Sequence, residues 1–408
     1  MKGDNNPTLK RFAKRLVGLV GARGFNMAAN VVALLLVARW VGPVKFATLA
    51  ENQSLLMAIS GFAALGIPLF ALRAAARGYN AAVGFALFIN LISTGVIASA
   101  GVVLAIMHCS LAAILVIPLA IAVALEKNQE VRIGLGVEFG KSRIINTMIV
   151  TRGVILVLGI LGSGILAYDP LTAYVGSRFI GSTIAAIFMY RATNMWPMQR
   201  HPPHDGTMHS FGGFALGDVF ASISSLDVWL VGIVSTPLNV GLYGAVNRLG
   251  APISLFTGSL RTVIMGSATR SSDQQIWRGV RVAFFLSLVL IIPAGILAIF
   301  SPWLTIVILG SGYTGAAGAL AGILLSVPAM MASPMIGTFL QASGYAGKIA
   351  RNTGIWNVAL LVLIAVGAFL WGATGAAAGT AITTWGKYFS LLIIAKKTYH
   401  HSIKKSND

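Results

Sequence analysis

The sequence predicts an all-α polytopic membrane protein in which twelve transmembrane helices form two six-helix lobes. First, about a dozen apolar segments of helical length follow one another along the 408 residues, and a bilayer core about 30 Å thick needs roughly 20 apolar residues per span. Second, the links between the segments are alternately rich and nearly empty in Lys and Arg, as in loops on opposite sides of a membrane. Third, 56% of the residues are hydrophobic, only 11 are acidic, and the mean hydropathy is +0.82. This composition leaves no room for a sizeable water-soluble domain.

Twelve segments are long and apolar enough to be spans. In chain order they cover 18–38, 46–72, 81–107, 111–125, 144–167, 171–190, 211–235, 240–265, 282–300, 316–342, 353–371 and 374–395. The fourth segment is the shortest, and a miscount there would reverse the orientation of every later span. The charge of the links argues against a miscount.

Basic residues concentrate in the two tails and in the links that follow the even-numbered spans. Examples are Arg73, Arg77, Lys127, Arg132, Lys141, Arg143, Arg270, Arg278, Arg281, Lys348 and Arg351. The other links hold only Arg39 and Lys45. Because cytoplasmic links carry the basic excess, we expect both termini to be cytoplasmic.

The net charge of +19 would suggest a nucleic-acid partner in a soluble protein. Here the basic residues follow the topology and do not gather in one basic domain, so we interpret them as contacts to anionic membrane lipids, with no nucleic-acid partner. The single cysteine, Cys109, can form no internal disulfide. Neither observation suggests a cofactor.

A polar, proline-containing stretch divides the chain into two halves. We expect an N-terminal lobe over 1–193, a cytoplasmic linker over 194–210, and a C-terminal lobe with a basic tail over 211–408. His201 and His204 lie in the linker without a Cys nearby, so a solvated loop is expected there and no metal site.

The two halves resemble each other weakly. A hairpin with Pro43 at its turn follows the first span, and a similar hairpin with Pro237 follows the seventh. Six is an even number, so the second half enters the membrane in the same direction as the first. Halves of this kind are related by a pseudo-two-fold axis along the membrane normal, with a substrate site expected between them.

Pairs of glycines in the later spans have the spacing that brings membrane helices into close contact. Gly318 and Gly322 form one such pair, and Gly375 and Gly379 form another. We expect them to pack helices within a lobe; a dimer contact is the alternative. Prolines inside spans, such as Pro293 and Pro328, are expected to bend their helices.

Several short motifs occur in a characteristic order and spacing. They are Ala38-Arg-Trp-Val-Gly-Pro43 followed by Phe46, Leu65-Gly-Ile-Pro68 with Arg73, Asp227, Val240-Gly-Leu-Tyr243 with Arg248-Leu249, and Gly375-Ala-Ala-Ala-Gly379. With the twelve spans, they make the whole chain resemble the polysaccharide and lipid-linked oligosaccharide flippases, of the O-antigen translocase type, in the multidrug/oligosaccharidyl-lipid/polysaccharide exporter superfamily. Two positions depart from that family: Ala47 stands where Gly is usual, and Lys45 where an acidic residue is common.

The resemblance implies a V of two six-helix lobes that works by alternating access. It also implies a substrate, an oligosaccharide linked to undecaprenyl pyrophosphate, which moves from the cytoplasmic to the outer leaflet of a bacterial cytoplasmic (inner) membrane. Such transport serves the biosynthesis of surface polysaccharides such as lipopolysaccharide O-antigen or exopolysaccharide.

Arginines inside spans are the leading site candidates. They are Arg23, Arg152, Arg178, Arg248 and Arg261. A charge at mid-bilayer costs about 2.5–3.5 kcal/mol on insertion scales, so such residues need a wet cavity or partners. Arg261 is close enough to the cytoplasmic end to reach it. Arg152 and Arg178 lie near mid-depth, and we expect no acidic residue at that depth in their half.

With Arg23 and Arg248, these two arginines are expected to form a cationic cavity. Guanidinium groups bind phosphate oxygens in bidentate pairs, which makes a pyrophosphate head group the expected anion. The alternative is that Arg152 or Arg178 bonds to free backbone carbonyls or faces lipid head groups.

Two carboxylates fall at the depths of two arginines. Asp227 and Arg248 lie at nearly equal distances from Pro237, and with a rise of about 1.5 Å per residue they share one depth. An ion pair between neighbouring helices is expected; alternatively, Asp227 releases Arg248 when a lipid phosphate arrives, or takes up a proton. By the same offset Arg23 falls next to the depth of Asp218. If spans one and seven line the cleft, as the resemblance implies, this pair could bridge the lobes and close the cytoplasmic entrance. Asp218 and Asp227 are therefore candidates for gating and for coupling to H⁺ or Na⁺.

Two other functions fit the sequence less well. A multidrug or cation extruder needs acidic groups in its pocket, whereas in the spans arginines outnumber carboxylates, and the first half offers only Glu51. A membrane glycosyltransferase or polysaccharide polymerase usually has large outer loops with acidic or His residues, and the outer links here are short. The chain also lacks the Gly-x-x-x-x-Gly-Lys-Ser/Thr loop of ATPases. We therefore predict a transporter and no enzyme.

Overall fold

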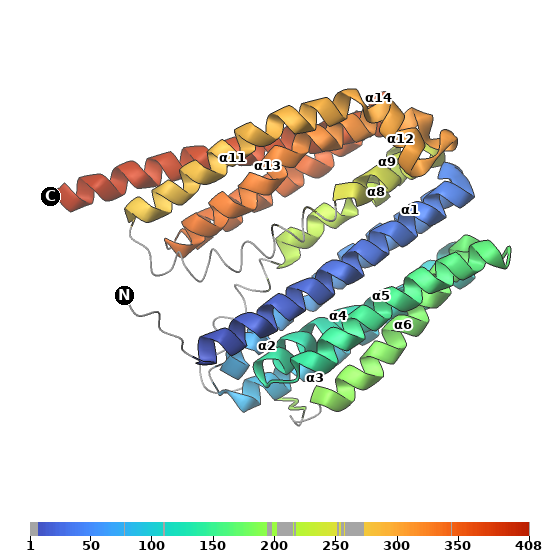
Figure 1. Ribbon diagram of the computed structural model, residues 1–408, viewed down its shortest axis with the longest axis horizontal. Coiled ribbons are helices and arrows are strands. Elements are labelled where there is room, and N and C mark those ends of the chain that lie inside the picture. The colour runs from blue at the N-terminus through green and yellow to red at the C-terminus, as the bar shows by residue number, and fades with distance from the viewer. Residues whose placement is uncertain are drawn as a thin grey trace. The chain divides into compact units, whose positions relative to one another are not determined.

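Helices are the regular elements throughout the described part of the chain. The computed structural model describes residues 7–76, 78–108, 111–193, 198–201, 215, 218–250, 253, 257, 273–343 and 345–407. Its elements are α1 (Pro7–Ala64), α2 (Ile67–Ala76), α3 (Asn80–His108), α4 (Leu111–Glu138), α5 (Ser142–Ile165), α6 (Pro170–Thr193), η1 (Ser224–Leu226), α8 (Asp227–Val234), α9 (Pro237–Asn247), η2 (Arg248–Gly250), α11 (Asp273–Ile299), α12 (Ser301–Leu309), η3 (Ser311–Ala316), α13 (Ala317–Ala342) and α14 (Ala346–Asn407). Figure 1 shows most of them as long helices. The predicted all-α class is confirmed.

The chain divides into two compact units. Unit 1 comprises Met1–Val37 and Leu55–Ser222, and unit 2 comprises Ala38–Ser54 and Ile223–Asp408. The chain thus passes from one unit to the other three times, twice inside α1. The last passage follows residue 222, beyond the predicted linker 194–210, of which only 198–201 are described. The predicted domain boundaries stay a prediction.

Unit 1 is built around α4. Helices α2, α3 and α6 each pack against α4, and α5 packs against α6. One apolar cluster joins α2, α3 and α4 around Phe70 and Leu135, and another joins α1, α4, α5 and α6 around Ile145 and Met189. These clusters hold the helices that carry the buried arginines described below.

Helix α1 is two spans joined at a glycine. Gly42 has a φ of 77° and a ψ of 167°, a backbone conformation that a residue without Cβ adopts freely. Pro43 begins the next helix, where its missing N–H leaves no donor unsatisfied. Figure 1 places α2 at the same end as the start of α1, so the chain reverses direction between them. The second span is broken again at Leu65 and Gly66, whose φ values are 47° and 69°.

Helix α14 is likewise two spans. Trp371 and Gly372 interrupt it, and Gly372 has a φ of 58°. The two arms then fold back on each other and pack closely. A Cβ on Gly367 would overlap the backbone of Gly375, and one on Gly379 would lie 2.6 Å from the carbonyl oxygen of Leu363.

The other predicted glycine pair packs α13 against α14. A Cβ on Gly318 would lie 2.7 Å from the Thr374 hydroxyl, and one on Gly322 would lie 3.2 Å from the Ala377 side chain. Both glycine pairs therefore pack helices within unit 2, as expected, and the dimer alternative is not needed to explain them.

The tip of the first hairpin, residues 38–54, packs into unit 2. The Tyr313 hydroxyl donates to the Ala38 carbonyl at 3.0 Å, and the Arg39 guanidinium donates to the Val307 carbonyl at 2.9 Å. On the other arm, the Pro43 carbonyl lies directly against Gly241, where any Cβ would overlap it. Two residues from one half of the sequence are thus tied by hydrogen bonds to the helices of the other half.

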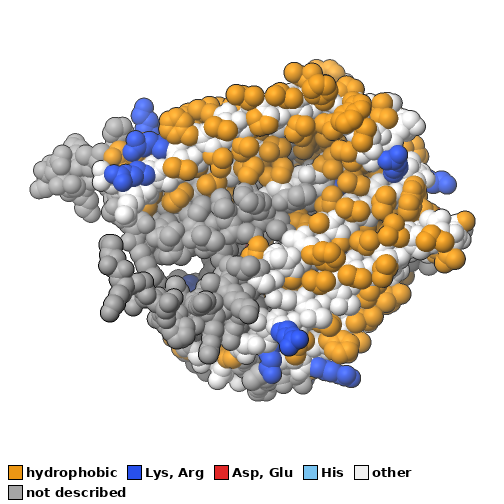
Figure 2. Space-filling view, viewed as in Figure 1, with side chains coloured by type: hydrophobic (Ala, Val, Ile, Leu, Met, Phe, Trp, Pro, Cys, Tyr) orange, Lys and Arg blue, Asp and Glu red, His pale blue; other side chains and the backbone are white. Residues whose placement is uncertain are grey.

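The helices are suited to a hydrocarbon environment. Within the described residues, seven helical stretches are long and apolar enough to cross a membrane. Two of them, with 47 and 53 residues, contain the breaks at Gly42 and Gly372 and are each about twice the length that one crossing needs. Figure 2 shows hydrophobic side chains along the flanks of the helices, with Lys and Arg confined to a few places. The protein is a multi-pass membrane protein.

Two elements differ from the sequence prediction. Helix α4 continues to Glu138, thirteen residues beyond the predicted end at Leu125, so a charged stretch assigned to a link is helical. Helix α12, Ser301–Leu309, was expected to be a link. Its nine residues are too few for a span, and the spans alone gave no reason to place a helix there.

Candidate functional site

A buried ion pair ties α4 to α6 in unit 1. The Arg178 guanidinium donates to the Glu126 carboxylate through Nε at 3.0 Å and through Nη2 at 2.8 Å. Its third nitrogen donates to the Tyr174 hydroxyl at 3.1 Å, and Ser182 donates to the same carboxylate at 3.0 Å. The side chain of Arg178 is 3% exposed and that of Glu126 is 18% exposed. The charge of Arg178 is therefore matched by Glu126, and each of its three nitrogens donates a hydrogen bond.

This pair corrects the expectation that Arg178 has no acidic residue at its depth. Glu126 follows the predicted end of the fourth span and was placed in a cytoplasmic link. Because α4 continues without a break, Glu126 lies on the helix face that packs against α6. The predicted fourth span ended at Leu125, the residue before Glu126, so the sequence did not identify Glu126 as the partner of Arg178.

Arg152, on α5, is bound by neutral groups. Its Nε donates to the Asn26 side-chain oxygen and its Nη1 donates to the Gln129 side-chain oxygen, both at 3.3 Å. Gln129 is itself held, because its amide donates to the Ser182 carbonyl at 2.7 Å. Arg152 is half-buried, and these two hydrogen bonds are long, so the guanidinium has donors that a ligand can take over.

We call Glu126, Arg152 and Arg178, with the polar side chains that bind them, the arginine cluster. It holds two guanidinium groups and one carboxylate, and Glu126 is attracted by both arginines. The cluster therefore carries a net positive charge. Glu126 pairs with Arg178, so the excess positive charge is on the part-exposed Arg152. The sequence predicted both arginines as site residues, which stays a prediction, and gave no sign of their partners Glu126, Asn26 and Gln129.

A second buried arginine, Arg132, was also missed. It lies six residues after Glu126 on α4 and is 4% exposed. It donates to Asn128 at 3.1 Å and to Thr193 at 3.0 Å, and its guanidinium carbon lies 4.6 Å from the centre of the Tyr190 ring. The sequence assigned Arg132 to a solvated link, because the same boundary error ended the fourth span too early.

Asp218 lies at the break between α1 and α2. Its carboxylate accepts a hydrogen bond from the Gly66 backbone N–H at 3.1 Å, and Lys127 is the cation that attracts it most. Arg23, the predicted partner, is exposed. The sequence led us to expect that this pair bridges the two lobes. Arg23 and Asp218 both belong to unit 1, so a pair between them would lie within that unit.

Asp227 opens α8, directly after the tight turn η1. One carboxylate oxygen accepts from the Val228 N–H at 2.8 Å. The other accepts from the Asn247 amide at 2.6 Å and from the Tyr243 hydroxyl at 3.4 Å. Arg248 attracts the carboxylate electrostatically. These three hydrogen bonds all come from neutral donors, and the predicted ion pair between Asp227 and Arg248 stays a prediction.

The remaining candidates are spread through the chain. Arg261 and His204 lie outside the described residues. Glu51 lies against Gly232 on α8. Lys387 lies inside the second arm of α14, within the predicted twelfth span. The described residues contain no group of three His, Cys, Asp or Glu side chains that could hold a metal ion.

Comparisons with known proteins give two kinds of relative, whereas no protein-family model matches the chain. Over 168 residues, which are 39% of this chain and 35% of the relative, the sequence is 32% identical to the probable low-salt glycan biosynthesis flippase Agl15 of Haloferax volcanii. The match thus spans about a third of the length of that protein.

Two solved structures that resemble the chain are transporters. One is an inward-facing multidrug resistance MATE family transporter of the MOP superfamily, with a TM-score of 0.73, 13% identity, and coverage of 94% of this chain and 96% of that one. Another is the Vibrio cholerae MATE transporter VcmN in the bent form, with a TM-score of 0.61, 14% identity, and coverage of 96% and 98%. The chain therefore has the MATE transporter fold. The predicted resemblance to a flippase of this superfamily is confirmed.

Proposed function

We propose that this protein is a flippase that moves a lipid-linked oligosaccharide from the cytoplasmic to the outer leaflet by alternating access. Its substrate would carry the sugar on undecaprenyl pyrophosphate and would serve the biosynthesis of a surface polysaccharide, such as O-antigen or exopolysaccharide. The site of action would be a bacterial inner membrane, with both termini in the cytoplasm. Three features support the proposal: the similarity to a glycan flippase, the transporter fold, and the charge of the arginine cluster.

The observation that carries the proposal is the environment of Arg152. A guanidinium inside a membrane protein is costly unless it has a partner or lines a wet cavity. Arg178 has its partner in Glu126, whereas Arg152 is bound by the amide oxygens of Asn26 and Gln129. A pyrophosphate oxygen would form shorter, charge-assisted bonds with the same N–H groups. Arg152 is therefore the proposed contact to the head group, and Arg178 keeps the cluster in shape.

The other site residues have secondary roles in this proposal. Arg23 is exposed and would attract the anionic head group, and Arg248 would exchange between Asp227 and a phosphate. Asp218 and Asp227 would respond to H⁺ or Na⁺ during the transport cycle. Membrane potential alone also favours export, because each negative charge that leaves a negative interior gains about 2.3 kcal/mol per 100 mV.

A multidrug extruder is the second candidate, because both solved relatives described above are MATE transporters. The Asp227 carboxylate, held mainly by neutral donors, is the kind of group that a cationic drug would need. The positive arginine cluster opposes this function, since it would repel a cation. A membrane glycosyltransferase or polymerase has no support in the described helices.

Reconstitution separates these functions. Full-length protein in liposomes is given an undecaprenyl-pyrophosphate-linked oligosaccharide on one side, and the other leaflet is sampled with a sugar-binding lectin. Relocation of an unaltered lipid, absent in empty liposomes, supports a flippase. An altered product indicates an enzyme. Uptake of tetraphenylphosphonium without relocation of the lipid indicates a cation extruder, and both of the last two results would contradict the proposal.

A further inference from the structure

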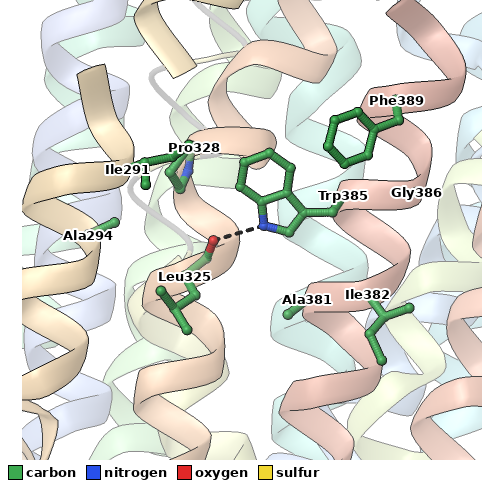
Figure 3. Close-up of a pocket in the computed structure, with 9 residues that line it drawn as sticks. All are labelled: Ile291, Ala294, Leu325, Pro328, Ala381, Ile382, Trp385, Gly386 and Phe389. Atoms are coloured by element: carbon green, nitrogen blue, oxygen red, sulfur yellow. Dashed lines mark hydrogen bonds between the residues drawn. The ribbon is translucent and has the colours of Figure 1, made fainter. Parts of the chain in front are cut away.

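A cavity of about 580 Å³ lies between α11, α13 and the second arm of α14. Its lining is almost wholly apolar and includes Leu325, Pro328, Ala381, Ile382, Trp385 and Phe389. Figure 3 shows the Trp385 indole reaching across from α14 toward α13, with Phe389 one turn along the same helix. Every lining residue belongs to unit 2, so the cavity is complete within that unit.

Prolines and an indole make this hollow. Pro328 removes a helix hydrogen bond in the middle of α13, and the Trp385 indole N–H donates to the nearby Leu325 carbonyl at 3.0 Å. Pro293 lies between the lining residues Ile291 and Ala294 on α11. The indole N–H is the only polar side-chain group in the lining, and it already has its acceptor. The lining therefore has no side-chain donor left to hold a polar ligand.

The cavity opens onto an exposed, apolar surface of unit 2. Ile382 and Phe389 are 59% and 53% exposed, and Leu325 is 45% exposed. All three lie on helical stretches that are long and apolar enough to span a membrane. The mouth of the cavity is therefore apolar and lies on segments suited to hydrocarbon.

The depth of the cavity points to a chain that serves both leaflets. Pro328 lies at the centre of α13, Ala317–Ala342, and Trp385 lies near the middle of the arm of α14 that follows Gly372. A head group attached to a long tail held at mid-depth can reach either surface. A phospholipid acyl chain, anchored at one interface, brings only its end to this depth.

We infer that this cavity holds part of the polyprenyl tail of the lipid carrier while the head group crosses the membrane. The inference rests on the proposed function and names the binding site for the tail of its substrate. A tail that leaves lipid for protein gains nothing from the hydrophobic effect, so recognition comes from van der Waals fit. A polyprenyl chain, stiffened by its double bonds, loses less conformational freedom on binding than a saturated acyl chain does.

Photolabelling tests the site directly. Full-length protein in phosphatidylglycerol nanodiscs is exposed to polyprenyl pyrophosphate with a diazirine in mid-chain or, separately, to phosphatidylglycerol with a diazirine on its acyl chain. We expect the polyprenyl probe to label peptides of α13 and α14 around the cavity at least about fivefold more than the phospholipid probe does. Equal labelling by the two probes, or no labelling of these peptides, would overturn the inference.

Three variants and a transport assay complete the test. Ala381→Trp fills the cavity and should reduce polyprenyl labelling by about fivefold or more, whereas Ile393→Trp, on the exposed side of the same arm, should leave it unchanged. Arg152→Ala should lose transport while keeping the labelling given by a mid-chain diazirine polyprenol, which lacks the pyrophosphate. Labelling that survives Ala381→Trp refutes the tail site while the flippase stands. Wild-type labelling without any relocation of a lipid-linked sugar refutes the proposed function.

Discussion

Removing the Arg178 side chain should destabilise the protein more than any other substitution in the arginine cluster. Arg178→Ala deletes two charge-assisted hydrogen bonds, of 3.0 and 2.8 Å, and leaves Glu126 as a buried carboxylate. Breaking a buried pair by removing one partner typically costs about 3–5 kcal/mol. Ser182 still donates to Glu126 and Arg152 still attracts it, so we expect a loss near the lower end, about 3 kcal/mol.

The assay is reversible unfolding of the full-length protein in mixed micelles, followed by tryptophan fluorescence. The double variant Glu126→Gln with Arg178→Gln should recover most of the stability, because the two amides can bond to each other and neither leaves a charge. Arg143→Ala is a matched control on exposed surface and should change stability by less than about 0.5 kcal/mol. A loss below about 1 kcal/mol for Arg178→Ala, or a double variant weaker than the single one, would refute this account of the pair.

Three further variants test other parts of the molecule. In the liposome assay, Arg152→Ala should lower transport of the lipid-linked sugar at least about tenfold. Because the partners of Arg152 are neutral, this variant should lose no more than about 1.5 kcal/mol of stability. Arg152→Lys should recover transport only in part. Gly241→Ala should cost about 1–3 kcal/mol because its Cβ would overlap the Pro43 carbonyl, whereas Gly295→Ala, which meets open space, should cost nothing; equal thermal stabilities of these two variants would contradict the packing of the hairpin tip. Asp227→Asn should leave insertion intact and abolish any stimulation of transport by an imposed proton gradient, and full stimulation in this variant would remove Asp227 as the coupling group.

The fold could be predicted from the sequence because the bilayer imposes a length and a charge asymmetry on every span. Hydropathy gave the spans, and the basic links gave an orientation that stays a prediction. The end of the fourth span was wrong for a physical reason: Glu126 and Arg132 are charged, and hydropathy treats a charge as the end of a membrane helix. In the structure both side chains have polar partners on other helices, which makes a buried charge tolerable.

Partners on different helices explain what else was missed. Arg152 and Arg178 were recognised because an arginine in a span is costly wherever it lies. Arg178 has an acidic partner, whereas Arg152 is bound by amide oxygens. This difference depends on the rotation of α4, α5 and α6 about their axes, which no local sequence pattern predicts. Arg23 and Asp218 were paired by their depth alone, whereas the Asp218 carboxylate accepts a hydrogen bond from the Gly66 N–H at the break after Leu65.

The central claim is that Arg152 binds the diphosphate of the lipid carrier, and a comparison of affinities tests it most directly. The measurement is binding of undecaprenyl pyrophosphate and of uncharged undecaprenol to purified protein in nanodiscs of neutral lipid, for the wild type and for Arg152→Ala. We predict that the wild type binds the pyrophosphate at least about tenfold more tightly than the alcohol, a difference of about 1.4 kcal/mol or more, and that this preference disappears in Arg152→Ala. An unchanged preference in the variant, or no preference in the wild type, would contradict the claim.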